Sequence, residues 1–170
     1  MTARVIATAV LVCTALLLGG CQRDDGSGPT KITGRLFVFN YRVSTAVYMV
    51  TLGKLAPLPE DSAVITEFEN PQGGAPIVTR TKIYPFWDKI TLESPALHCI
   101  VKDKPYTVKM RIVGPGDTPL QHLQTTITSD LDQSILPAKP LVVGPVYTPN
   151  PEVFKADGST DYAPETGCKT

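Results

Sequence analysis

The sequence predicts an all-β fold, an antiparallel β-sandwich or small barrel of about seven to nine short strands with one disulfide. Three observations support this prediction. Short segments rich in β-branched and aromatic residues recur along the chain, and several alternate between apolar and polar residues. Sixteen prolines in 170 residues interrupt the chain too often for long helices. Two cysteines are available for a bridge: Cys99 lies in the β-rich part, and Cys168 lies in the tail that follows it.

The strand segments follow one another in a regular series. Composition predicts strands at residues 32–41, 45–52, 63–68, 77–87, 89–93, 98–101, 105–113, 120–128 and 140–147. Alternation assigns the two faces of the second segment. One face carries Val47, Met49 and Thr51, and the opposite face carries Ala46, Tyr48, Val50 and Leu52. In the segment at 105–113, one face consists of Tyr106, Val108, Met110 and Ile112.

Turns and one short helix are expected between these strands. Prolines and glycines at 71–74 and 114–116 are typical of turns. A short helix is predicted at 129–135, with Ser129 as its N-cap and Asp130 in its first turn. Asp130 and Asp132 also form a pair of carboxylates. We interpret this pair as helix capping rather than as a metal or acid–base site, because nothing nearby in the sequence completes such a site.

The first twenty residues have the layout of a bacterial secretory signal. Arg4 precedes an apolar stretch of about 14 residues, whereas a helix that spans a membrane needs about 20. The stretch ends in Leu18-Gly19-Gly20-Cys21, which resembles the lipobox of bacterial lipoproteins. The resemblance implies cleavage between Gly20 and Cys21, and a covalent N-acyl diacylglycerol group on Cys21 as the only added group. A plain signal peptide is the alternative, and a transmembrane anchor is the weaker competitor.

The residues after the cleavage point complete the expected domain organisation. Residues 21–31 are the lipidated N-terminus and a flexible tether without apolar periodicity. In lipoproteins an Asp after the modified cysteine favours retention at the inner membrane, so Gln22 implies the outer membrane. Residues 32–147 are the expected β-domain. Residues 148–170 form an irregular tail with three prolines and two glycines.

A disulfide between Cys99 and Cys168 is expected to hold this tail to the domain. Export to an oxidising compartment is expected to join the one remaining pair of cysteines in a bridge. Free thiols are the alternative. The two cysteines are 69 positions apart. Loop-closure entropy then predicts a stabilisation of roughly 4 kcal/mol. Two cysteines and two distant histidines lack the paired spacing of a zinc site.

Charge and motifs indicate a binding protein and not an enzyme. Cleavage leaves 15 basic and 16 acidic residues, so no basic field is expected to hold nucleic acid. No common catalytic motif occurs, and His98 beside Cys99 is not expected to form a thiol–imidazole pair. His122 is interpreted as a surface residue of a strand. An aromatic cluster is expected to pack in the core, or to mark a binding hot spot if it is exposed; it consists of Tyr84, Phe86 and Trp87.

The β-domain resembles the YscW-type pilotins of type III secretion and the YbaY-like envelope lipoproteins. The resemblance covers residues 32–143, and its clearest parts are the opening strand at 32–38, the strand at 46–52 and the Tyr-led strand at 106–112. It implies an outer-membrane lipoprotein, facing the periplasm, that binds the C-terminal segment of a secretin subunit and uses the lipoprotein sorting machinery. A structural or stress-related envelope lipoprotein and a small-ligand-binding lipoprotein are the alternatives.

Overall fold

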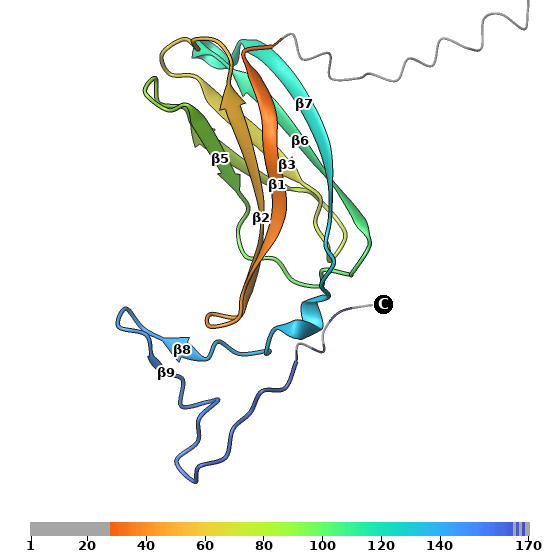
Figure 1. Cartoon of the computed structure of the whole chain (residues 1–170), viewed down its shortest axis with the longest axis vertical. Coiled ribbons are helices and arrows are strands. Elements are labelled where there is room, and N and C mark those ends of the chain that lie inside the picture. Colours follow the sequence, from red (N-terminus) through yellow and green to blue (C-terminus); the bar gives the residue numbers. More distant parts are fainter. Residues whose placement is uncertain (1–27, 165, 167, 169–170) are drawn as a thin grey trace, which may run out of the picture.

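Two antiparallel sheets form the body of the protein, as the computed structural model of residues 28–164, 166 and 168 shows (Figure 1). The three-stranded sheet has the order β1-β2-β5 and consists of β1 (Thr30–Asn40), β2 (Thr45–Lys54) and β5 (Lys89–Glu93). The four-stranded sheet has the order β4-β3-β6-β7 and consists of β4 (Ile77–Lys82), β3 (Ala63–Phe68), β6 (Pro105–Val113) and β7 (Pro119–Thr128). A small third sheet pairs β8 (Val142–Val143) with β9 (Thr148–Pro149). The predicted β-sandwich is confirmed.

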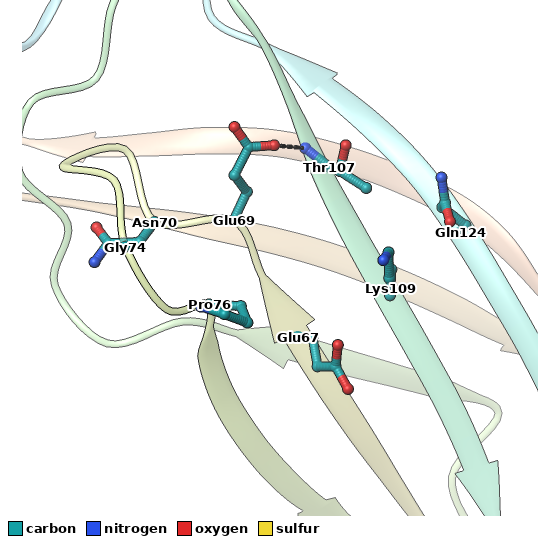
Figure 2. Close-up of a pocket in the computed structure, with 8 residues that line it drawn as sticks. All are labelled: Glu67, Glu69, Asn70, Gly74, Pro76, Thr107, Lys109 and Gln124. Carbon is teal, nitrogen blue, oxygen red and sulfur yellow. Dashed lines mark hydrogen bonds between the residues drawn. The ribbon is translucent and has the colours of Figure 1, made fainter.

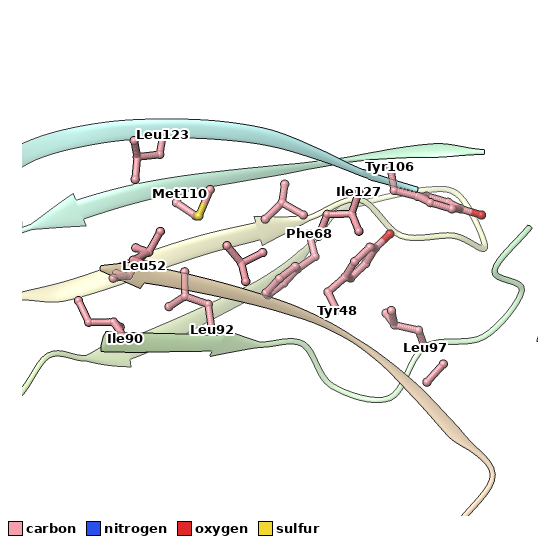
Figure 3. Packing of buried hydrophobic residues seen from close by; sticks show 14 of the residues in the cluster. Tyr48, Leu52, Phe68, Ile90, Leu92, Leu97, Tyr106, Met110, Leu123 and Ile127 are labelled. Atoms are coloured by element: carbon pink, nitrogen blue, oxygen red, sulfur yellow. The ribbon is translucent and has the colours of Figure 1, made fainter. Parts of the chain in front are cut away.

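One apolar core lies between the two large sheets (Figure 3). One of the two predicted faces of β2 is fully buried. It consists of Ala46, Tyr48, Val50 and Leu52. The predicted face of β6 is buried as well. Three aromatic rings meet at the centre: Tyr48 stacks on Phe68 with ring centroids 5.4 Å apart, and Phe37 lies 4.6 Å from Tyr48. Such ring pairs contribute about 0.5–1.5 kcal/mol beyond the apolar area that they bury.

A β-bulge in β1 changes which of its residues face the core. Ile32 pairs with Leu52, but Gly34 pairs with Thr51, so Thr33 is the extra residue. Ile32 and Phe37 therefore both pack against the core, although strict alternation would place them on opposite faces. A Cβ atom at Gly53 would lie 2.9 Å from Thr33 Cγ2, so the bulge favours a glycine at Gly53.

Two of the expected strands are shorter than predicted because turns interrupt them. The strand predicted at 77–87 ends at Lys82, and the backbone N–H of Trp87 donates to the Tyr84 carbonyl at 3.0 Å to close a turn. The strand predicted at 140–147 is reduced to β8, because Gly144 has a φ of 73° and begins a turn. A positive φ at Gly144 cannot continue an extended strand.

The strand predicted at 98–101 is wrong. Cys99 has a φ of 66°, in the left-handed region that a strand excludes. Leu97, just before this segment, makes an isolated bridge to Ala46 of β2. Cys99 is joined to Cys168 with their Cα atoms 5.1 Å apart, so the predicted disulfide is confirmed.

The helix predicted at 129–135 is a single 3₁₀ turn, η3 (Gln133–Ile135). Its cap is Asp132 and not Ser129, because Asp132 Oδ1 accepts a hydrogen bond from the Ser134 N–H at 3.0 Å. This hydrogen bond lowers the pKa of the Asp132 carboxyl below its ordinary value. Ser129 instead closes its own local turn with Leu131. Capping is therefore confirmed for Asp132 of the carboxylate pair, but the helix that it caps is shorter than expected and Asp130 lies outside it.

The sandwich has two different ends. β1 begins and β2 finishes at one end, where the connections at 55–62, 83–88 and 114–118 also lie (Figure 1). We call this the N-terminal end. The opposite, C-terminal end carries the β1–β2 turn, the disulfide, β8 and β9. There the segment that contains β8 is fixed to the β1–β2 turn, because the Leu141 N–H donates to the Arg42 carbonyl at 2.8 Å.

Gln121 of β7 fastens the start of β1. Its amide oxygen accepts from the Thr30 backbone N–H at 3.1 Å and from the Thr30 hydroxyl at 2.9 Å. Its Nε2 donates to the Thr30 carbonyl at 2.9 Å. These bonds join the two large sheets on one side of the sandwich.

We expect Gln121→Ala to lower the free energy of unfolding by about 1–2 kcal/mol, because the Thr30 groups are buried and lose their partners. Urea denaturation measures this loss, and hydrogen exchange should rise first at Thr30. Gln124→Ala is the matched control, since Gln124 is exposed on the same strand. Equal losses in the two variants would contradict a specific role for Gln121.

Candidate functional site

The free edge of the four-stranded sheet is β4. Within the described part of the chain β4 pairs with β3 only, so one side of its backbone is open. The outward side chains of this strand are exposed, and Val78 is 59% exposed. The opposite edge strand, β7, is partly covered, because β1 lies against it at the Gln121–Thr30 hydrogen bonds. An open strand edge is a template on which an extended peptide can pair.

A polar hollow of about 460 Å³ lies on the outer face of the same sheet (Figure 2). It extends from the β3–β4 hairpin across β6 to β7. Its lining residues are Glu67, Glu69, Asn70, Gly74, Pro76, Thr107, Lys109 and Gln124. Pro76 immediately precedes β4, so the hollow opens at the start of the free edge. We call β4 and this hollow together the edge site.

Glu69 holds the hairpin side of the hollow in place. Its carboxylate accepts from the Thr107 backbone N–H at 2.8 Å, and its own N–H donates to the Thr107 carbonyl at 2.9 Å. Its carbonyl accepts from the buried Tyr48 hydroxyl at 2.9 Å. Burial raises the pKa of Tyr48, so this hydroxyl stays protonated and remains a donor. The Glu69 carboxylate is therefore committed to structure.

Three polar side chains of neighbouring strands remain for recognition in the middle of the hollow. Glu67 of β3 pairs in register with Lys109 of β6, which in turn pairs with Gln124 of β7. On its other side Glu67 pairs in register with Val78 of β4. This row places an acid, a base, an amide and an apolar side chain across one sheet face. The side chains of this row can contact those of an extended polar segment, and the backbone of such a segment can pair with the open edge of β4.

Two buried hydroxyls lie on the core side of the edge. Thr66 of β3 and Thr79 of β4 pair in register, and the hydroxyl oxygens of both are buried without a hydrogen-bond partner among the described residues. An unsatisfied buried hydroxyl costs about 1–3 kcal/mol. The edge of the sheet is therefore less stable locally than its centre, where apolar side chains fill the same layer.

The aromatic cluster of Tyr84, Phe86 and Trp87 divides between core and solvent. Trp87 is partly buried and packs against the core, as expected. Tyr84 and Phe86 are 41% and 78% exposed, which corrects the expectation that the whole cluster packs inside. They belong to the turn at 83–88, where the expected strand ends. A second hollow, of about 330 Å³, lies beside them and is lined in part by Leu55 and Pro85.

The remaining predicted residues do not join a common site. Gly20 and Cys21 lie outside the described residues. His122 is exposed on β7, as predicted. His98 is exposed, while the neighbouring Cys99 sulfur is bonded to Cys168 and is not a thiol. In the described ranges no three His, Cys, Asp or Glu side chains come together as a metal site, and no helix is long and apolar enough to cross a bilayer.

Sequence reasoning missed the edge site. Glu67, Lys109 and Gln124 come from three strands, and only the strand order brings them together. The turn signal at 71–74 was the one local sign, since it predicted the hairpin that borders the hollow. The chain matches no protein-family model and no curated protein.

Proposed function

We propose that this protein is a lipid-anchored envelope protein that binds an extended segment of another protein at the edge site. The segment we propose is the C-terminal part of a secretin subunit, and the outcome of binding is delivery of that subunit to the outer membrane. Cys21 carries the lipid in this proposal, and the β-domain faces the periplasm. The protein acts as a chaperone and pilotin, without chemistry of its own.

The observation that carries the proposal is a lipobox cysteine on the same chain as a β-domain with a free strand edge. Two or three acyl chains hold a protein stably on a bilayer, whereas one chain does so only marginally. A free edge offers main-chain hydrogen bonds to a partner of any sequence, and neighbouring side chains then select among partners. Val78 lies on the edge strand itself, Glu67 lies in register with it on the neighbouring strand β3, and these two side chains supply that selection.

The edge site favours a peptide over a small molecule. Its hollow is open and mostly polar, whereas small-molecule pockets are enclosed and mostly apolar. Neither Tyr84 nor Trp87 lines either of the two hollows described. The cavity that the ligand-binding alternative requires at these aromatic residues is therefore not supported.

We expect Thr81→Lys to weaken partner binding, because a charge that points inward at a sheet edge opposes strand addition. Thr81 is half-buried on β4, and Thr126→Lys on the exposed face of β7 is the matched control. The measurement is fractionation of secretin multimers between inner and outer membranes, in cells with the wild-type protein, with each variant and without the protein. The proposal predicts loss from the outer membrane without the protein, reduced delivery with Thr81→Lys, and normal delivery with Thr126→Lys. Multimers that reach the outer membrane in its absence would contradict it.

A further inference from the structure

The turn at 83–88 places exposed aromatic rings at the N-terminal end of the sandwich. Phe86 is 78% exposed, and its ring centroid lies 5.6 Å from that of Tyr84. Tyr84 in turn contacts the Trp87 ring, with centroids 4.9 Å apart. Leu55, half exposed, lies beside the second hollow that Pro85 also lines. Contiguous exposed apolar side chains are typical of surfaces that contact a partner or a membrane.

The start of the described chain lies beside these rings. The Pro29 carbonyl accepts from the Leu55 N–H at 2.7 Å and from the Ala56 N–H at 3.2 Å. Gly28 is seven positions after Cys21, with six residues between them. A segment of that length reaches at most about 25 Å. The C-terminal end of the sandwich lies farther away, since the eleven residues of β1 extend over roughly 35 Å.

We infer that this aromatic turn rests in the headgroup layer of the membrane that holds Cys21, so that the N-terminal end of the sandwich faces the bilayer. The inference rests on the lipid anchor of the proposed function. The tether holds Pro29 within its reach of the bilayer surface, and the exposed rings lie on the same end. Tyrosine and tryptophan are the residues that membrane proteins place at the interface, because each ring is apolar with one polar group.

Electrostatic attraction does not explain the inferred contact with the membrane, so we attribute this contact to the aromatic rings. Lys54 donates to the Pro85 carbonyl at 2.6 Å, and Lys82 pairs with Asp61 at 3.0 Å. Among the described residues, basic and acidic side chains are mixed at this end, as with Lys82 beside Asp61 and Lys89 after Asp88, so we assign the attraction of anionic lipids no role. We therefore expect added salt to change the contact little.

Trp87 is the only tryptophan of the chain and reports directly on this contact. The acylated full-length protein is reconstituted on vesicles of phosphatidylethanolamine and phosphatidylglycerol, part of which carries brominated acyl chains. Bromine quenches tryptophan fluorescence at short range. We expect strong quenching of Trp87 in the wild-type protein and loss of most of it in Phe86→Asp. Val146→Asp is the matched control, because Val146 is also 78% exposed but lies at the C-terminal end, and it should retain the quenching.

Mass spectrometry and vesicle flotation of the same samples separate the two claims. Acylated protein that floats with the vesicles while Trp87 stays unquenched would overturn the membrane contact and leave the anchor intact. Equal loss of quenching in Phe86→Asp and Val146→Asp would also overturn it. A chain without acyl groups would overturn both, because nothing would then hold the turn at a bilayer.

Discussion

Replacing Cys99 and Cys168 by alanine is expected to lower the free energy of unfolding by about 4 kcal/mol, because the bridge closes a loop of 69 positions. Small domains are stable by only about 5–15 kcal/mol, so the loss is a large share of the total. The positive φ at position 99 also loses the covalent bond that holds it in the wild-type protein, which adds to the expected loss.

Urea denaturation of the wild-type protein and the Cys99→Ala/Cys168→Ala variant measures this effect. The tail should also become accessible to limited proteolysis before the sandwich does. Few apolar contacts hold the tail in place besides the buried Val153, and its hydrogen bonds, such as Ala138 N–H to the Ala163 carbonyl at 2.7 Å, form largely within residues 137–164. An unchanged urea midpoint, or a tail that resists cleavage without the bridge, would contradict this role of the disulfide.

Replacing Cys21 by serine is expected to abolish membrane attachment, because a hydroxyl cannot take the place of the thiol that receives the diacylglycerol in the proposed anchor. We expect an unprocessed or soluble species without acyl label, recovered away from the membrane fraction. Cys13→Ser is the matched control, since Cys13 lies in the apolar stretch of the proposed signal, and this variant should be processed normally. Unchanged acyl labelling of Cys21→Ser would contradict the prediction.

The sequence predicted those parts of the fold that depend on local alternation. The buried faces of β2 and β6 follow from the period of two, because each strand is covered on one side by the core. The prediction was wrong where one backbone angle decides. At Cys99 the positive φ has no sign in the sequence, whereas at Gly144 the Gly-Pro dipeptide is a turn signal that the strand prediction did not use. The bulge at Thr33 likewise depends on a partner strand that local sequence does not specify.

The candidate site was less predictable than the fold, for a physical reason. Glu67 and Lys109 meet because β6 pairs with β3, although a hairpin, β4 and β5 separate them along the chain. Pairings at such sequence separations arise from packing of the whole sandwich. The exposure of Phe86 was equally hard to predict from local sequence, because it depends on the residue at which β4 ends. The Cys99–Cys168 bridge was predictable, because the expected compartment is oxidising and only one pair of cysteines follows the proposed cleavage point and the lipidated Cys21.

Both proposals depend on a lipid at residue 21 that ties the β-domain to a membrane, and intact-mass analysis of the protein purified from its own envelope decides whether that lipid is present. We expect a chain that begins at Cys21 and carries a diacylglycerol and an N-linked acyl group. A mature chain with a bare N-terminus at any other residue would be incompatible with the anchor.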